Sequence, residues 1–291
     1  MPAYYISYFY WKVEMNTVRK LLKIDCIEEK GIIGQDIVVA ILDTGMAEHP
    51  DLKEKIILFK DFVGNREKCY DDNGHGTHVA GLVAGDGTAS MGKYRGAAPG
   101  CGIISLKVLD RYGTGSQDDV LRALRWIREN RQQYRIRVVN ISVGTTCNSK
   151  RNHARLLESV EQLWDEGVVV VTAAGNQGPR PGSITAPGSS KKVITVGSSD
   201  LLEGRSAISG RGPTAECVCK PDIVAPGNKI MSCVPGKPYS YGVKSGTSMS
   251  TPLVTGAIAC ALEKNQTGSL RRTRAERGGK TDCGTREGNQ E

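Results

Sequence analysis

Three kinds of side chain in this sequence could together attack a carbonyl and move a proton: a carboxylate, an imidazole and a hydroxyl. Asp43 directly follows the apolar run Ile37–Leu42, and a carboxylate at the end of a buried strand needs a partner because an isolated buried charge is costly. His75 stands between Gly74 and Gly76, which would let its imidazole approach other groups and transfer protons.

Plainer interpretations exist for both residues. Asp43 taken alone could equally cap the following turn. His75 and His78 could bind a metal, but the sequence offers no third ligand at a suitable spacing and no HExxH motif. We interpret His78 as a core histidine whose polar atoms are satisfied.

The hydroxyl would come from the segment Ser245–Leu262. Thr247, Ser248 and Ser250 crowd the start of an apolar helix that has Pro252 in its first turn. A serine at a helix N-terminus is commonly only a cap. The residue pattern by itself does not choose among the three hydroxyls.

Asn176 is a candidate for stabilising negative charge. It follows the apolar run Val168–Thr172 after a turn of small residues, and its amide could donate a hydrogen bond to a developing oxyanion. The alternative is an asparagine that only forms the turn.

The elements that must position these residues alternate between short buried strands and helices. Asp118–Asn130 and His153–Glu166 have apolar residues at helical spacing. The alternation predicts an α/β fold, a three-layer, doubly wound, mostly parallel sheet with helices on both faces. Asp43 and Asn176 would then lie at the carboxyl edge of the sheet, where functional groups gather. The predicted strands are Ile37–Leu42, Gly102–Val108, Val138–Val143, Val168–Thr172 and Val193–Val196.

Composition restricts the class of protein. The chain has 291 residues, of which 39% are hydrophobic, and no stretch reaches the roughly 18–20 apolar residues that span a bilayer. The net charge of +8 comes without a nucleic-acid motif, so neither a membrane nor a specific nucleic acid is expected as a partner. The nine cysteines are scattered, and without an evident signal peptide they favour the reducing cytoplasm. The sequence carries no indication of an oligomeric state.

The chain divides into three parts. Residues 1–30 are predicted to form an N-terminal extension and a first helix, and residues 31–264 the main domain. From 265 to 291 the residues are mostly Gly, Arg, Thr, Glu and Asn, which predicts a polar, disordered tail. Its basic part, 271–286, could contact an acidic surface, although such tails are usually just solvated.

The order Asp, His, Ser and the segments around these residues resemble the subtilisin-like serine peptidases (subtilase family). The layout resembles that of the intracellular subtilisins, and the likeness covers residues 31–262, about four-fifths of the chain. The likeness is specific because it extends over many motifs. They are VAILDTG, HPDL at 49–52, NGHGTHVAG, GAAPG at 96–100, NISVG at 140–144, AAGN, KPDIVAPG at 220–227 and GTSMSTP.

The resemblance implies a serine endopeptidase that hydrolyses peptide bonds in polypeptides through an acyl-enzyme. It assigns Ser248 as the nucleophile and His75 as the base, with Asp43 fixing the imidazole tautomer. It assigns Asn176 to the oxyanion, together with the backbone N–H of Ser248.

The resemblance also maps a substrate groove. An extended substrate would pair with Tyr112–Ser116 and Ser142–Gly144, where glycines would let a second backbone approach. Ala173–Gly175 would wall the pocket for the residue before the scissile bond, and small walls imply broad specificity with an apolar preference. The predicted substrate-binding residues are Gly113, Gly115, Ser142, Gly144, Ala174 and Gly175.

Two features depart from the family pattern. No cofactor is implied for the chemistry, but family members often bind structural calcium, and Asp51 matches one ligand position. The segment Gly85–Tyr94 should supply further ligands, yet Asp86 is its only acidic residue, whereas calcium needs about six to eight oxygens.

The second departure follows Leu262, where the further helices and strands of the family are missing. The alternative is therefore a catalytically impaired, truncated homologue that only binds peptides. An esterase of another fold is disfavoured because no serine lies in a G-x-S-x-G motif.

Overall fold

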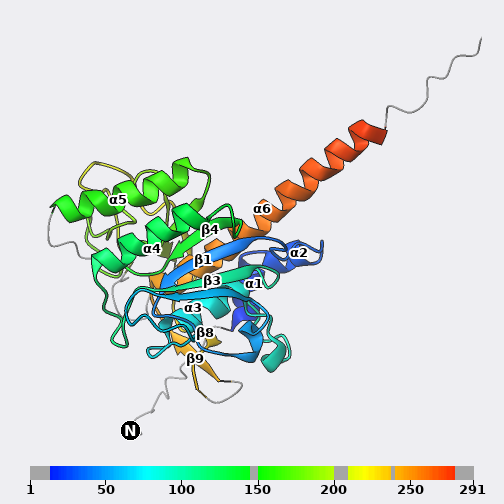
Figure 1. Ribbon diagram of the computed structural model, residues 1–291, viewed down its shortest axis with the longest axis horizontal. Coiled ribbons are helices and arrows are strands. Elements are labelled where there is room, and N and C mark those ends of the chain that lie inside the picture. The colour runs from blue at the N-terminus through cyan, green and yellow to red at the C-terminus, as the bar shows by residue number, and fades with distance from the viewer. Residues whose placement is uncertain (1–13, 145–149, 200–208, 237–239, 279–291) are drawn as a thin grey trace, which may run out of the picture.

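The computed structural model describes residues 14–144, 150–199, 209–236 and 240–278. Its centre is a seven-stranded sheet in the order β2-β3-β1-β4-β5-β6-β7, and all neighbouring strands are parallel (Figure 1). The predicted α/β fold is confirmed. The strands are β1 (Val38–Asp43), β2 (Ile56–Asp61), β3 (Gly102–Lys107), β4 (Ile136–Ile141), β5 (Val169–Ala173), β6 (Ile194–Ser198) and β7 (Ile223–Ala225).

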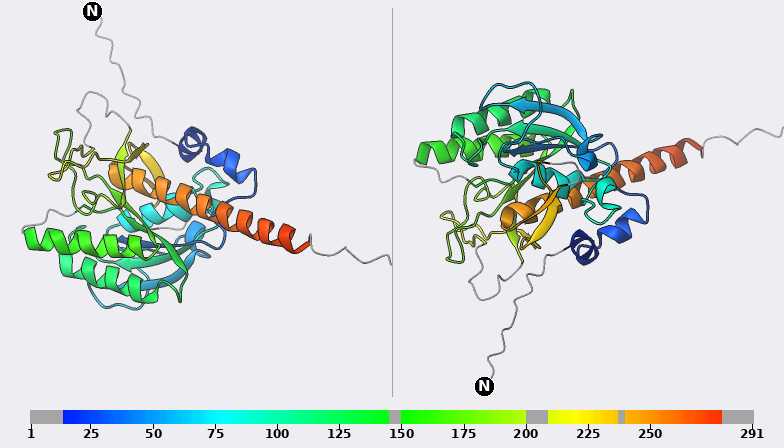
Figure 2. Two further views of the ribbon diagram at one scale, coloured as in Figure 1. Left: turned by 90° about the horizontal axis from the view of Figure 1, so that it is seen from above. Right: turned by 90° about the horizontal axis from the view of Figure 1, so that it is seen from below.

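Helices cover both faces of the sheet, because successive strand residues point to opposite sides. On β1, Val39 and Ile41 pack into the core beneath α3 and α6, whereas Ala40 and Leu42 pack beneath α4 and α5. Figure 2 shows the two helix pairs on opposite sides of the sheet. The helices are α1 (Met15–Leu21), α2 (Ile24–Glu28), α3 (His75–Ala84), α4 (Gln117–Asn130), α5 (Lys150–Asp165) and α6 (Thr247–Gly278), with short 3-10 turns η1 (Pro50–Leu52) and η2 (Thr88–Ser90).

The helix α4 forms as the sequence predicts. Ser116 caps it by accepting a hydrogen bond from the Asp119 N–H at 3.1 Å, and Asp118 adds negative charge to the first turn. One apolar stripe is buried against the sheet, and this burial stabilises the helix more than propensity does. The stripe consists of Val120, Ala123, Leu124 and Ile127.

The carboxyl edge of the sheet is where the site residues gather. Because the strands are parallel, β1 ends at Asp43 beside Lys107, the last residue of β3, and β5 ends at Ala173 on the same edge. The helices α3 and α6 both begin at this edge, with His75 and Thr247.

A hairpin that the sequence analysis did not predict precedes α6. Its strands β8 (Ile230–Cys233) and β9 (Tyr241–Lys244) are antiparallel. His78 in α3 is fully buried under the hairpin, with Nε2 3.1 Å from the carbonyl oxygens of Ile230 and Gly242. His78 is thus a core residue as interpreted, but the expectation that its polar atoms are satisfied holds only for Nε2, because Nδ1 has no hydrogen-bond partner within the described residues.

The last helix, α6, continues through Gly278 and projects beyond the sheet (Figure 1). Residues 265–278, which the composition assigned to a disordered tail, belong to this helix, and the Leu, Arg, Ala and Glu residues in 270–277 are good helix formers. Residues 279–291 of the predicted tail and 1–13 of the predicted extension lie outside the described residues. No helix in the described part is both long and apolar enough to span a membrane.

Candidate active site

Asp43 is buried at the end of β1 and is bonded through one of its two carboxylate oxygens, because Oδ2 has no hydrogen-bond partner among the described residues. It is 1% exposed, and its Oδ1 accepts a hydrogen bond from the Thr44 N–H at 2.8 Å and lies 2.7 Å from Nδ1 of His75. Its backbone carbonyl accepts from the N–H groups of Val108 and Leu109. The buried carboxylate therefore has the partner that its position demands, and that partner is His75.

A second buried aspartate, Asp71, organises the loop that carries His75. Asp71 Oδ1 accepts from the Thr44 hydroxyl at 2.8 Å and the Gly74 N–H at 2.7 Å. Its Oδ2 accepts from the N–H and the hydroxyl of Thr77 at 2.8 and 2.6 Å. Burial alone would raise the pKa of Asp71, but these hydrogen bonds hold it below its ordinary value. The carboxylate stays charged and locks the start of α3 to the end of β1.

The glycines beside His75 are required by backbone geometry. Gly74 has φ +88°, a conformation that side chains disfavour. A Cβ on Gly76 would lie 2.0 Å from the carbonyl oxygen of Gly45. Both glycines let α3 begin against the segment after β1, which brings the imidazole to Asp43.

The environment of His75 favours its protonated form more than water does. Burial alone would lower the pKa of His75, but the Asp43 carboxylate outweighs it and raises the pKa above its ordinary value. The side chain is 23% exposed, and no hydrogen bond to its Nε2 is formed by the residues that the structure describes. This nitrogen is therefore open to accept a proton.

The three hydroxyls at the start of α6 differ in accessibility. Thr247 is fully buried and donates to Asn176 Oδ1, and Ser250 is fully buried and donates to the Ala225 carbonyl at 2.9 Å. Ser248 is partly exposed, and its Oγ donates to the Ser142 carbonyl at 2.5 Å. Of the three, only Ser248 can be reached by a substrate.

Ser248 Oγ does not hydrogen-bond to His75 in the described geometry. Its hydroxyl must rotate away from the Ser142 carbonyl before His75 can accept its proton. Nucleophile–base hydrogen bonds are often loose without substrate, so this rotamer is compatible with a triad.

Asn176 presents its amide nitrogen and not its oxygen. Its Oδ1 accepts from the Thr247 N–H at 3.0 Å and from the Thr247 hydroxyl at 3.1 Å. The side chain is exposed, and its Nδ2 has no hydrogen-bond partner among the residues that the structure describes. The amide is thereby oriented as a hydrogen-bond donor beside Ser248, as an oxyanion donor requires.

Comparison with known proteins agrees with this geometry. The model of the subtilase family matches residues 34–276. The chain belongs to the subtilase family.

The subtilase is 39% identical over 259 residues to serine protease AprX of Bacillus subtilis (strain 168), covering 80% of this chain and 58% of AprX. It is 37% identical over 236 residues to subtilisin Savinase of Lederbergia lenta, covering 81% and 80% of the two chains. A crystal structure of a cold-adapted subtilisin-like serine proteinase matches with a TM-score of 0.66 and 31% identity, covering 80% of this chain and 78% of that one. The subtilase thus spans less than two thirds of the length of AprX.

The predicted substrate-binding residues lie in loops that follow β3, β4 and β5 at the carboxyl edge. Their glycines have structural reasons that the sequence analysis missed. A Cβ on Gly115 would lie 2.2 Å from the Val108 carbonyl, and a Cβ on Gly144 would lie 2.4 Å from Thr185 Oγ1. Neighbouring segments of the same chain, and not only a substrate, therefore demand glycine. Gly113 has φ +74°, and among the described residues only Asn73 Nδ2, at 3.6 Å, would lie within 4 Å of a Cβ at this position, so this side of Gly113 is open.

Thr185, which the sequence analysis did not identify, lies next to the predicted pocket residues Gly144 and Gly175. Its Oγ1 is buried without a hydrogen-bond partner in the described structure, and it lies between Gly144 and Gly175. Ala174 is buried behind it and accepts a hydrogen bond from the Thr185 N–H at 3.1 Å. The predicted pocket therefore has a hydroxyl among its small apolar walls.

Asp51 is fully buried, and protein donors engage both of its carboxylate oxygens. Oδ1 accepts from the Ala89 N–H at 2.7 Å and Oδ2 accepts from the Tyr241 hydroxyl at 2.8 Å. Among the His, Cys, Asp and Glu side chains that the structure describes, those of His49 and Cys233 group with Asp51, with ligand atoms within 4.8 Å of one another. Imidazole and thiol are not ligands that calcium prefers. The surroundings of Asp51 do not fit calcium.

Lys107 was also missed, although the sequence carries a signal for it. It is the one charged residue in the apolar run Gly102–Val108, and a buried charge needs partners. The same reasoning identified Asp43 at the end of Ile37–Leu42. No motif indicates the partners of Lys107, whereas the family likeness indicates His75 as the partner of Asp43.

Proposed function

We propose that this subtilase is a serine endopeptidase that hydrolyses polypeptides through an acyl-enzyme intermediate. The observation that carries the proposal is the 2.7 Å contact between His75 Nδ1 and Asp43 Oδ1, at the edge where α6 presents the accessible Ser248 hydroxyl. Family membership supports the same activity.

In the proposed mechanism, the Ser248 hydroxyl turns toward His75 Nε2, loses its proton to it and attacks the scissile carbonyl carbon. The buried carboxylate of Asp43 stabilises the imidazolium and fixes its tautomer without taking the proton. The oxyanion of the tetrahedral intermediate accepts hydrogen bonds from Asn176 Nδ2 and the Ser248 N–H. The imidazolium then protonates the leaving amine, and a water molecule repeats the sequence on the acyl-enzyme.

We further propose that the substrate is an extended polypeptide lying along Tyr112–Ser116 and Ser142–Gly144. The open side of Gly113 supports the binding of a substrate along Tyr112–Ser116. The apolar walls at Ala174 and Gly175 support a broad preference for apolar side chains, and the Thr185 hydroxyl adds a polar atom to that pocket. Location in the reducing cytoplasm remains a prediction from the cysteines.

No metal takes part in the proposed steps. We propose that hydrogen bonds from Ala89 and Tyr241, and not calcium, satisfy the carboxylate of Asp51. This arrangement gives the subtilase a calcium-independent anchor between η1 and the hairpin β8–β9.

The test of the activity is covalent labelling with a fluorophosphonate probe, measured by intact mass, on the wild type and on Ser248→Ala. Labelling of the wild type alone, together with cleavage of an unstructured protein such as casein, would establish the peptidase. Wild-type protein that binds peptides but takes up no probe would instead establish the non-catalytic homologue.

A further inference from the structure

Lys107 is a fully buried lysine at the carboxyl end of β3. Its side chain is 1% exposed, and it lies beside Asp43 in the register of the β1–β3 pair. An ammonium group taken out of water is costly unless every donor is satisfied. Its position at the active edge of the sheet therefore calls for an explanation beyond packing.

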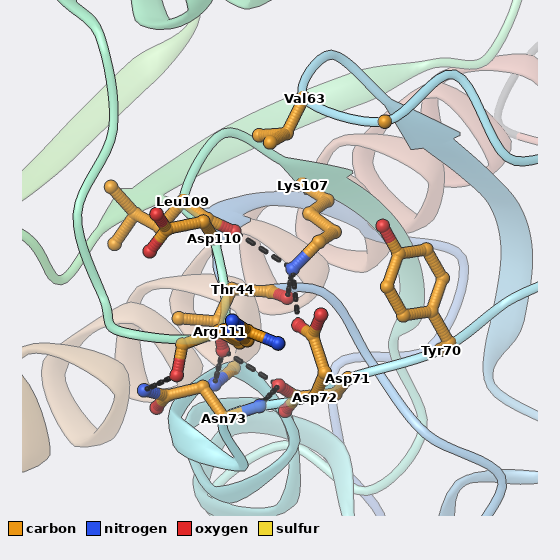
Figure 3. Close-up of polar contacts among 12 residues, drawn as sticks. Thr44, Val63, Tyr70, Asp71, Asp72, Asn73, Lys107, Leu109, Asp110 and Arg111 are labelled. Atoms are coloured by element: carbon orange, nitrogen blue, oxygen red, sulfur yellow. Dashed lines mark hydrogen bonds and ion pairs between the residues drawn. The ribbon is translucent and has the colours of Figure 1, made fainter.

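The ammonium group bonds to three segments that carry the proposed site (Figure 3). Nζ donates to the Thr44 carbonyl at 2.6 Å, directly after Asp43. It donates to the Leu109 carbonyl at 2.8 Å, three residues before the proposed substrate segment Tyr112–Ser116. It donates to Asp72 Oδ1 at 2.8 Å, three residues before His75. All three ammonium protons are thereby used.

The surroundings make a lysine specifically suitable. Two of the three acceptors are backbone carbonyls, which no neutral apolar side chain could satisfy. Asp72, 40% exposed, supplies the counter-charge, and the Tyr70 ring lies 4.9 Å from Nζ, within range of a cation–π interaction. A methionine of similar length would leave both carbonyls and the carboxylate without this donor.

A second contact joins the loop before His75 to the loop after β3. Asn73 Oδ1 accepts from the His75 N–H at 3.2 Å, and its Nδ2 donates to the Arg111 carbonyl at 3.0 Å. Figure 3 shows this contact beside the contacts of Lys107. The loop before His75 is therefore fixed at two points to residues 109–111, which lead into the proposed substrate segment Tyr112–Ser116.

We propose that Lys107 is a positioning residue, which sets the place of Asp43, of the His75 loop and of the substrate segment relative to one another. The proposal rests on the proposed peptidase activity. Lys107 touches neither the substrate nor the reacting atoms, so its effect reaches the chemistry only through Thr44, Asp72 and Leu109.

The chain offers a matched control in Lys220. Its side chain is 0% exposed, and its Nζ donates to the Val193 carbonyl at 2.7 Å and to Asp222 Oδ2 at 2.6 Å. None of its partners belongs to the proposed site. Lys107→Met and Lys220→Met should both lower the melting temperature, and both are then compared at a temperature where each is folded.

At equal folded fraction, Lys107→Met should lower kcat/KM for a long peptide by about 10²-fold, the size expected when reacting groups move by about 1 Å. It should also slow fluorophosphonate labelling, which needs no substrate segment, and reduce the rate advantage of long peptides over short ones. Lys220→Met should keep the wild-type values in all three measurements. Equal values for the two variants would overturn the proposal.

If Lys107→Met does not fold, Asp72→Ala tests the proposal and Asp222→Ala is its control. These carboxylates are 40% and 42% exposed, so both variants should fold. Asp72→Ala should lower kcat/KM about tenfold, the effect of one lost hydrogen bond to a charged group. A loss no larger than that of Asp222→Ala would overturn the proposal.

A readout without turnover separates this proposal from the proposed function. The Nδ1 proton of His75, held by Asp43, should give a low-field NMR resonance in the wild type and in Lys220→Met. Its loss or exchange broadening in Lys107→Met would support the positioning role even if the wild type took up no fluorophosphonate. An unchanged resonance in Lys107→Met, with unchanged labelling, would reject it.

Discussion

His75 Nδ1 lies 2.7 Å from Asp43 Oδ1, although 32 residues separate the two in the sequence. The contact forms because α3 begins at the carboxyl edge where β1 ends, and Asp71 binds both segments through Thr44 and Thr77. The imidazole is thus oriented by Asp43 through Nδ1, and Nε2 has no hydrogen-bond partner among the described residues.

Replacing Asp43 by Asn should leave the fold intact and lower kcat by about 10⁴-fold, because the amide favours the wrong tautomer of His75. Steady-state kinetics on a peptide substrate measure this. Asp61→Asn is the control, since Asp61 also ends a strand but bonds to the backbone of Val63 and Gly64. A similar loss of kcat in both variants would contradict the assignment of Asp43.

The pH dependence of kcat/KM should follow the ionisation of His75. The proposed base must be neutral, and protonation increases as pH falls, so activity should be lost on the acid side. Because Asp43 raises the pKa of His75, the midpoint should lie above about 6.5, the ordinary value for histidine.

In Asp43→Asn the residual activity should show a lower midpoint, since the carboxylate that raises the pKa of His75 is gone. A pH–rate profile of both proteins checks this. A midpoint that does not move between them would show that another group controls the acid limb.

Asn176→Ala should lower kcat by about 10²–10³-fold with little change in KM, because the amide donates only to the developing oxyanion. Thr247→Val is the graded comparison. It removes one of the two hydrogen bonds to Asn176 Oδ1 and keeps the one from the backbone N–H, so its loss should be smaller. An increase in KM alone for Asn176→Ala would point to ground-state binding.

Glu263→Ala should lower the free energy of unfolding by about 3 kcal/mol, because it removes a buried carboxylate that accepts hydrogen bonds from three backbone N–H groups. These groups belong to Ile33, Gly34 and Gln35, ahead of β1, so the side chain ties α6 to the sheet. Urea denaturation measures the change. Glu129→Ala, exposed on α4, should change it by less than about 0.5 kcal/mol.

Adding calcium, or removing it with EGTA, should leave the melting temperature unchanged. The carboxylate of Asp51 already has donors in Ala89 and Tyr241, and its other neighbours are an imidazole and a thiol. Differential scanning fluorimetry provides the measurement. A clear rise of the melting temperature with calcium would show that the ion displaces these hydrogen bonds.

The sequence by itself determined the alternation of strands and helices, since buried parallel strands are uniformly apolar and helices carry an apolar stripe. It also indicated Asp43 and Asn176, because polar groups that end apolar strands fall on one edge of such a sheet. The residue pattern also offered His75 for proton transfer, and the likeness in motifs selected Ser248 among three hydroxyls. The hairpin β8–β9 was not predicted, because its strands are only four residues each and lack a distinctive pattern.

Only the tertiary structure decided which polar groups meet. The sequence left Thr247, Ser248 and Ser250 equivalent before any family likeness, and their different burial separates them. It offered Asp51 as a possible calcium ligand, and only the folded chain brings the Tyr241 hydroxyl, nearly two hundred residues away, to this carboxylate. Lys107 likewise joins Thr44, Asp72 and Leu109 through contacts that no spacing encodes. Apolar patterning is periodic along the chain, but the partner of a buried charge is fixed only when distant segments pack.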